Sequence, residues 1–166
     1  MPETSRTDFL EVLRVLISRG VEFIVVGGVS AVLQGAPIST FDLDVVHSTN
    51  LKNIEALLAA LEQLGAYYRT QPAKRLRPQI SHLPSPGHQL LMTRFGPLDL
   101  LGAIGKGRDY EHLLAHSVQL EIEPGVTIRV LDLNTLITVK EETAGEKDNA
   151  MLPVLRRTLE ERSKKQ

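Results

Sequence analysis

The sequence predicts one α/β domain in which helices flank a small mixed β-sheet. Residues 21–26 form an apolar run rich in β-branched side chains, which is typical of a central strand buried on both faces. Residues 51–64 carry apolar side chains at helical spacing, and residues 118–131 contain two alternating runs around a Pro-Gly pair. These patterns predict, in turn, a sheet strand, an amphipathic helix and a β-hairpin.

The length and composition of the chain restrict what it can be. Its 166 residues are enough for a single domain, expected to span residues 1–166. Apolar residues make up 42% and aromatic residues only 4%, so the core must be mostly aliphatic. The absence of cysteine excludes disulfides, thiolate metal sites and cysteine nucleophiles. A polar N-terminus without a long apolar run predicts a cytoplasmic protein with no membrane span, and the net charge of −1 argues against broad nucleic-acid binding.

The first part of the chain, about residues 8–101, is expected to form the core of the domain. Its predicted elements are a helix capped by Thr7 or Asp8 and running to about Arg19, a strand at 21–26, a Gly27-Gly28 turn, a brief helix at 30–34, a strand at 38–46, a helix at 51–64 capped by Asn50, a short edge strand at Tyr67-Tyr68, a basic loop at 69–86, and hairpin strands at 89–95 and 98–101 around Gly96-Pro97.

The second part is expected to add a hairpin and helices at about 118–162. Its predicted elements are a loop at 102–107, a short helix at 110–114, hairpin strands at 118–122 and 127–131, a helix from Asp132 to about Thr143, and a last helix that contains Pro153 and runs to about Arg162.

Two carboxylates lie on the strand that follows the double glycine. Because strand side chains alternate between faces, Asp42 and Asp44 are expected to point one way while Phe41 points the other. Two carboxylates on one rigid face can bind a hard divalent cation such as Mg²⁺. The free amides that follow Gly27 and Gly28 could hold an anion at the start of the next helix. Phosphate and metal would then meet at one edge of the sheet.

Asp99 is a third candidate carboxylate, because it also lies on an expected strand among apolar residues. In two-metal nucleotidyl transfer, carboxylates hold two ions about 3.5–4 Å apart that stabilise the attacking and leaving oxygens. Asp99 could bind the second ion or take the proton from the nucleophile. Purely structural roles are the alternatives. The glycines could form a turn that needs positive φ, and the acids could cap turns or pair with arginine. Ser30 is as readily a helix cap as a phosphate ligand.

These residues resemble the nucleotidyltransferase superfamily, whose small members share a glycine turn, an Asp-x-Asp strand and a third acidic strand. The matching residues here are Gly27, Gly28 and Ser30, then Asp42 and Asp44, then Asp99. The segment 27–44 is most similar to the bacterial abortive-infection and toxin–antitoxin type, because Gly35, Pro37 and Thr40 fit its Gly-x-Pro-x-x-Thr link.

Near the C-terminus, Lys140, Lys147 and Asp148 look like the Lys and Lys-Asp pair of some members. Many relatives have arginine where this chain has Ile38. Relatives that modify transfer RNA or antibiotics usually add a helical substrate domain, for which this chain has little room.

The resemblance implies a nucleotidyltransferase fold and an enzyme that uses Mg²⁺ or Mn²⁺ to transfer a nucleoside monophosphate from a nucleoside triphosphate to an acceptor. It assigns catalysis and metal binding to Asp42, Asp44 and Asp99. It assigns nucleotide binding to Gly27, Gly28, Ser30, Thr40, Lys140 and Lys147. The acceptor could be a protein hydroxyl, an RNA end or a small molecule, and a partner protein could be encoded nearby.

Two further alternatives stay open. Arg69, Lys74, Arg75 and Arg77 could contact RNA or a triphosphate, although such residues are more often a solvated loop. The rival to an enzyme is a catalytically silent nucleotide-binding or antitoxin-like protein with the same fold.

Overall fold

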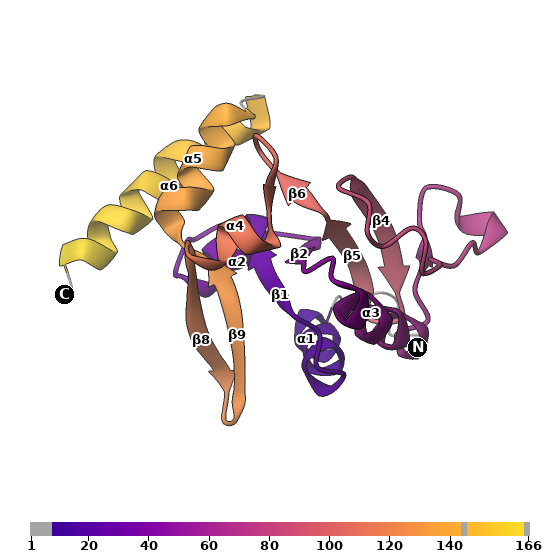
Figure 1. Ribbon diagram of the computed structural model, residues 1–166. Helices are drawn as coiled ribbons and strands as arrows, with labels where there is room; N and C mark the ends of the chain where they lie inside the picture. The colour runs from indigo at the N-terminus through magenta and orange to yellow at the C-terminus, as the bar shows by residue number, and fades with distance from the viewer. Residues whose placement is uncertain (1–7, 144–145, 165–166) are drawn as a thin grey trace, which may run out of the picture.

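The computed structural model describes residues 8–143 and 146–164, with the side chains of all of these except 146–149 (Figure 1). The helices are α1 (Phe9–Ser18), α2 (Gly27–Leu33), α3 (Leu51–Gln63), α4 (Tyr110–Leu114), α5 (Leu133–Glu142) and α6 (Glu146–Lys164), with a 3-10 turn η1 (Pro72–Lys74). The strands are β1 (Phe23–Val26), β2 (Leu43–His47), β3 (Tyr67–Tyr68), β4 (His88–Thr93), β5 (Gly96–Leu101), β6 (Ala103–Ile104), β7 (Arg108–Asp109), β8 (Ser117–Glu123) and β9 (Val126–Leu131).

The described strands other than β6 and β7 form one mixed sheet in the order β3-β4-β5-β2-β1-β9-β8. β2 runs parallel to β5 and β1 runs parallel to β9, while the other neighbouring pairs are antiparallel. The four residues of β1 are all buried, as the apolar run at this position predicts. The predicted small mixed sheet with flanking helices is therefore confirmed.

Helices cover the two faces of the sheet in different places. Alternate side chains of the central strands, such as Val25 and Leu43, pack with α1 and α3 on one face, and these two helices lie side by side in Figure 1. The intervening side chains, such as Ile24 and Val46, face the other way and pack with α4, α5 and α6. In Figure 1, α5 and α6 lie toward the β1–β9 side of the sheet.

The predicted helix caps are confirmed where a short polar side chain precedes the helix. The carboxylate of Asp8 accepts a hydrogen bond from the Glu11 amide, and the side chain of Asn50 accepts one from the Asn53 amide. Asp132 caps α5 in the same way. Each cap satisfies an amide that the first helical turn leaves without a partner.

The second predicted strand begins later than expected, because the strand pairing of this segment starts only at Leu43. β1 pairs with β2 only as far as Val26 opposite Asp44, and the chain then turns into α2. The Ile38 amide instead bonds the Ala36 carbonyl in a local turn. Phe41, expected on the strand, lies before it and is 77% exposed. Asp42 consequently lies just before β2 rather than within it.

Two other local predictions were wrong. Gly96 and Pro97 are strand residues of β5, and the turn consists of Arg94 and Phe95, because Thr93 pairs with Gly96 across the two strands. The Thr93 hydroxyl donates to the Gly96 carbonyl and accepts from the Phe95 amide. The loop expected at 102–107 includes β6, which pairs with β7 into a small hairpin. An ion pair between Arg108 of that hairpin and Glu142 ties it to α5.

The remaining predicted elements lie where the sequence placed them to within a few residues. Gly27 and Gly28 differ slightly from the prediction, because they are the first residues of α2 rather than a turn before it. Pro153 lies inside α6. No helix in the described ranges 8–143 and 146–164 is long and apolar enough to cross a membrane.

Candidate functional site

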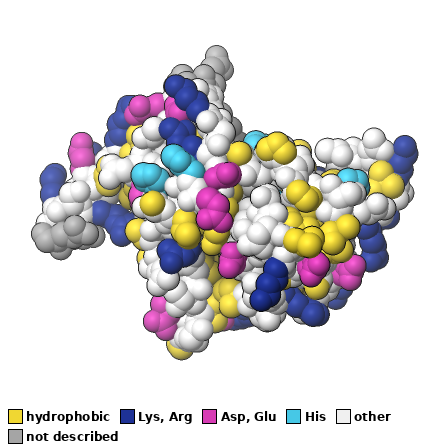
Figure 2. All heavy atoms as spheres, in the orientation of Figure 1, with side chains coloured by type: hydrophobic (Ala, Val, Ile, Leu, Met, Phe, Trp, Pro, Cys, Tyr) yellow, Lys and Arg dark blue, Asp and Glu magenta, His cyan; other side chains and the backbone are white. Residues whose placement is uncertain are grey.

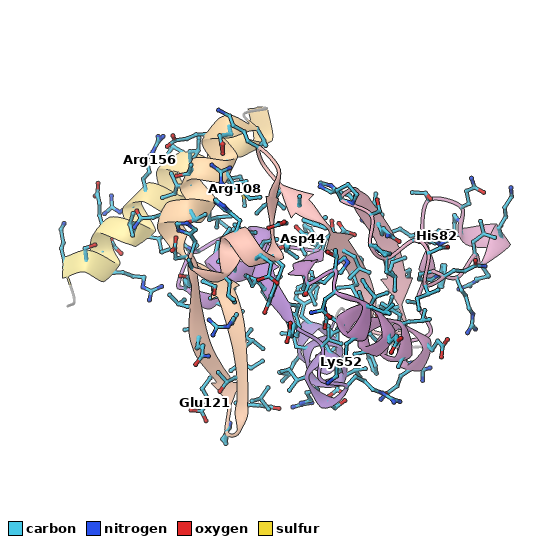
Figure 3. All side chains as sticks on the ribbon, viewed as in Figure 1. Asp44, Lys52, His82, Arg108, Glu121 and Arg156 are labelled. Carbon is cyan, nitrogen blue, oxygen red and sulfur yellow. The ribbon has the colours of Figure 1, made fainter. Side chains whose placement is uncertain are left out.

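Asp44 and Asp99 are side-by-side neighbours on parallel strands. The strand register places Val26 of β1 beside Asp44 of β2, and Asp44 beside Asp99 of β5. Neighbouring strands are about 4.8 Å apart, so the two carboxyl groups share one surface of the sheet. That surface is the one opposite α1 and α3, since Leu43 and Leu98 point toward those helices. Figure 3 shows Asp44 in the middle of the molecule.

The surroundings of Asp44 make its negative charge unfavourable. Its pKa is raised from 3.8 to about 7, mainly by burial and in addition by the neighbouring Asp99 and Asp42. The charge of Lys140 on α5 acts in the opposite direction. Asp42, Asp44 and Asp99 therefore form one electrostatic unit in which added positive charge is favoured.

The double glycine lies directly against this unit. Gly27 has φ +64°, a backbone conformation that side chains disfavour, and a Cβ there would overlap Oδ2 of Asp44. A Cβ on Gly28 would lie 2.8 Å from Oγ1 of Thr40. A side chain at either position would therefore force its neighbour to move, and at Gly27 that neighbour is a candidate catalytic carboxylate.

Ser30 and Thr40 use their hydroxyl groups to hold nearby backbone. The Ser30 hydroxyl is fully buried and donates to the Gly27 carbonyl at 2.7 Å. The Thr40 hydroxyl donates to the Asp42 carbonyl at 3.4 Å. In this structure the two residues order the first turn of α2 and the approach to β2, and their contact with a nucleotide stays a prediction.

Asp99 has a partner that sequence reasoning missed. Arg69 forms an ion pair with Oδ1 of Asp99, and its Nη1 also donates to the Leu91 carbonyl at 3.0 Å. The sequence placed Arg69 in a basic loop with three exposed neighbours. The one available signal was its position immediately after the edge strand Tyr67-Tyr68, from which its backbone amide still reaches the Leu90 carbonyl at 3.1 Å.

A pocket of about 260 Å³ opens beside Asp44 and Gly27. Lys140, half-buried on α5, lines it together with Val26, Gly27, Asp44, His88, Leu101, Ile104, Gly105, Leu136, Val139 and Thr143. The structure thus brings Lys140 to the predicted site. The side chain of Lys147 lies outside the described residues.

The carboxylates fit a divalent cation through the chemistry of their donor atoms. Carboxylate oxygens are the ligands that Mg²⁺ and Mn²⁺ prefer, and Asp42 and Asp44 concentrate negative charge that a cation would offset. Within 8–143 and the described side chains beyond, however, no three acidic or histidine residues converge as a ready-made metal cage. The arrangement is suited to an ion held by two aspartates and completed by water or phosphate.

The basic residues after β3 divide into two groups. Arg69 is turned into the site, whereas Lys74, Arg75 and Arg77 are exposed around η1. The Arg75 guanidinium lies over the Tyr67 ring, 4.2 Å from its centroid. Figure 2 shows basic side chains at the end of the molecule that carries η1.

Comparisons with known proteins agree with this architecture. No family model and no curated relative matches the sequence. TM1012 of Thermotoga maritima, a candidate nucleotidyltransferase, is 19% identical with a TM-score of 0.55, over 96% of this chain and 98% of its own. The lincosamide antibiotic adenylyltransferase LnuA, bound to lincomycin, is 11% identical with a TM-score of 0.62, over 92% and 96%. ANT(2″)-Ia in complex with adenylyl-2″-tobramycin is 14% identical with a TM-score of 0.57, over 91% and 87%. The chain therefore has the nucleotidyltransferase fold.

Proposed function

We propose that this protein transfers a nucleoside monophosphate from a nucleoside triphosphate to a hydroxyl acceptor, with pyrophosphate as the leaving group. The observation that carries the proposal is the register of Asp44 beside Asp99, with Gly27 against Asp44 and Lys140 at the same pocket. Acid groups, a close backbone approach and a basic side chain at one pocket support a site for a triphosphate and its cation.

The proposed roles follow from the chemistry of each group. Asp42 and Asp44 would hold Mg²⁺ or Mn²⁺, which when bound supplies positive charge next to the triphosphate. Lys140 would bind a phosphate oxygen, and the amides after Gly27 and Gly28 would lie against the same group. The acceptor oxygen forms a bond to the α-phosphorus, the bond to the β-phosphate oxygen breaks, and the acceptor proton passes to the Asp99 carboxylate.

The nature of the acceptor is best supported as a small-molecule hydroxyl. LnuA and ANT(2″)-Ia are bound to small molecules, and the chain covers 96% and 87% of their lengths. An RNA end bound through Lys74, Arg75 and Arg77, or a protein hydroxyl in a partner encoded nearby, are the other acceptors to test. A cytoplasmic location would suit a protein that uses nucleoside triphosphates.

A transfer assay with α-labelled ATP and Mg²⁺ tests the proposal against extract and against pooled small-molecule acceptors. Wild-type protein should label an acceptor, Asp44→Asn should abolish the labelling, and Asp8→Asn should not change it. Asp8 is a matched control because it caps α1 on an exposed surface and asparagine caps helices equally well. If calorimetry detects binding of ATP and Mg²⁺ but no nucleoside triphosphate labels an acceptor, the result would instead support a silent nucleotide-binding or antitoxin-like protein. No binding at all would remove the nucleotide site.

A further inference from the structure

Arg69 is held beside Asp99 by contacts with β4 and with the Asp99 carboxylate. Its backbone amide bonds the Leu90 carbonyl and its guanidinium bonds the Leu91 carbonyl, so the residue is anchored along β4. The same guanidinium nitrogen pairs with Oδ1 of Asp99. The side chains of Arg69 and Asp99 are only 23% and 11% exposed. This ion pair is largely shielded from solvent, unlike a surface ion pair between two mobile side chains.

The guanidinium interacts with the whole acidic unit. Its hydrogen bond to Asp99 is the main cause that raises the pKa of Arg69, and the charges of Asp42 and Asp44 act in the same direction. Arginine cannot lose its proton in proteins, so it supplies a permanent positive charge. Three aspartates with Arg69 and Lys140 leave a formal charge of about −1 at the site, which one divalent cation is enough to offset.

We propose that Arg69 stands at Asp99 in place of a second divalent cation, so that the site binds one such ion, through Asp42 and Asp44. This inference rests on the proposed function and specifies that the transfer uses one divalent ion. In a two-ion site, the second cation neutralises charge on the reacting phosphate. Here a fixed guanidinium holds the corresponding carboxylate, and its remaining N–H groups can donate to a phosphate oxygen.

Two observations favour this assignment over a three-carboxylate site. In the part of the chain that the structure describes, no three acidic or histidine side chains converge on one point. One oxygen of Asp99 is also already paired with Arg69. Asp99 is then left to orient, or to receive a proton from, the acceptor rather than to hold metal.

Counting bound Mn²⁺ tests the proposal without any measurement of activity. Metal-free protein is titrated with Mn²⁺ alone at pH 8, and bound ions are counted by calorimetry and by loss of the free-ion electron paramagnetic resonance signal. Wild type should bind one ion. Arg69→Gln frees Asp99 and should bind two, whereas Arg94→Gln, an exposed arginine in the β4–β5 turn, should bind one.

A double variant controls for charge and for folding. Arg69→Gln with Asp99→Asn leaves the net charge unchanged, so it should return to one ion with an affinity that is lower than that of wild type by no more than about 100-fold, the limit expected for an indirect partner. If thermal unfolding shows that Arg69→Gln alone does not fold, the double variant still tests the proposal. A much larger loss of Mn²⁺ affinity in the double variant would make Asp99 a direct ligand and overturn the proposal.

Other outcomes separate this inference from the proposed function. Two ions on wild type, or the same number and affinity for wild type and Arg69→Gln, would refute the role of Arg69 while leaving nucleotidyl transfer intact. No Mn²⁺ on any of the folded variants would instead remove the metal site on which the proposed function depends.

Discussion

Gly27 and Asp44 approach each other so closely that no side chain fits between them: a Cβ on Gly27 would overlap Oδ2 of the carboxylate. The contact links the start of α2 to β2 and leaves one oxygen of Asp44 against backbone. Glycine at this position therefore serves two purposes, since it also adopts φ +64°.

Replacing Gly27 with alanine should disturb both stability and the site. Alanine in this backbone conformation costs about 1–2 kcal/mol, and the overlap with Asp44 adds to that cost. Gly20→Ala is the matched control, because Gly20 has φ +72° and open space around it. Urea unfolding should show a loss for both variants, larger for Gly27→Ala, while Mn²⁺ affinity should fall only for Gly27→Ala. Equal Mn²⁺ affinities in the two variants would contradict the contact.

The raised pKa of Asp44 predicts how the metal-free protein responds to pH. Between about pH 4 and pH 7 the folded protein keeps a proton on Asp44 that the unfolded chain has lost, so this residue's contribution to the free energy of unfolding decreases as pH rises. Asp44→Asn cannot lose that proton. Urea titrations in EDTA should show the variant gaining stability relative to wild type from pH 4 to pH 8. A difference that stays constant, or shrinks, would show that Asp44 titrates normally.

Phe41 and Leu43 test where β2 begins. Phe41 is 77% exposed and Leu43 is fully buried, although only one residue separates them. Phe41→Ala should change the free energy of unfolding by less than about 0.5 kcal/mol. Leu43→Ala should cost about 2–5 kcal/mol, because it leaves a cavity against α1 and α3. Comparable losses for both would mean that the strand begins before residue 42.

Features that depend on neighbours in the sequence could be predicted. The caps at Asp8, Asn50 and Asp132 follow from a short polar residue placed just before an apolar helical pattern. The hairpin at 117–131 follows from alternation around Pro124-Gly125. The Asp-x-Asp pattern marked the carboxylate strand in part, because Asp44 lies on β2 whereas Asp42 lies just before it.

Features that depend on sheet order could not be predicted in this way. β2 starts at Leu43 because β1 ends at Val26 and offers no partner further on. The pairing of Arg69 with Asp99 joins residues 30 apart in sequence and requires β3, β4 and β5 to lie in that order. Apart from its position directly after Tyr67-Tyr68, nothing local distinguishes Arg69 from Lys74, Arg75 or Arg77, which lie in the same basic segment and stay exposed.

The fate of two labels on ATP tests the central claim most directly. One sample carries the label on the α-phosphate and the other on the γ-phosphate, each with Mg²⁺ and the same acceptor pool. Nucleotidyl transfer predicts that the α-label joins the acceptor, that the γ-label leaves as pyrophosphate, and that Asp44→Asn stops both. Transfer of the γ-label to the acceptor, or no movement of either label despite ATP binding, would contradict the account.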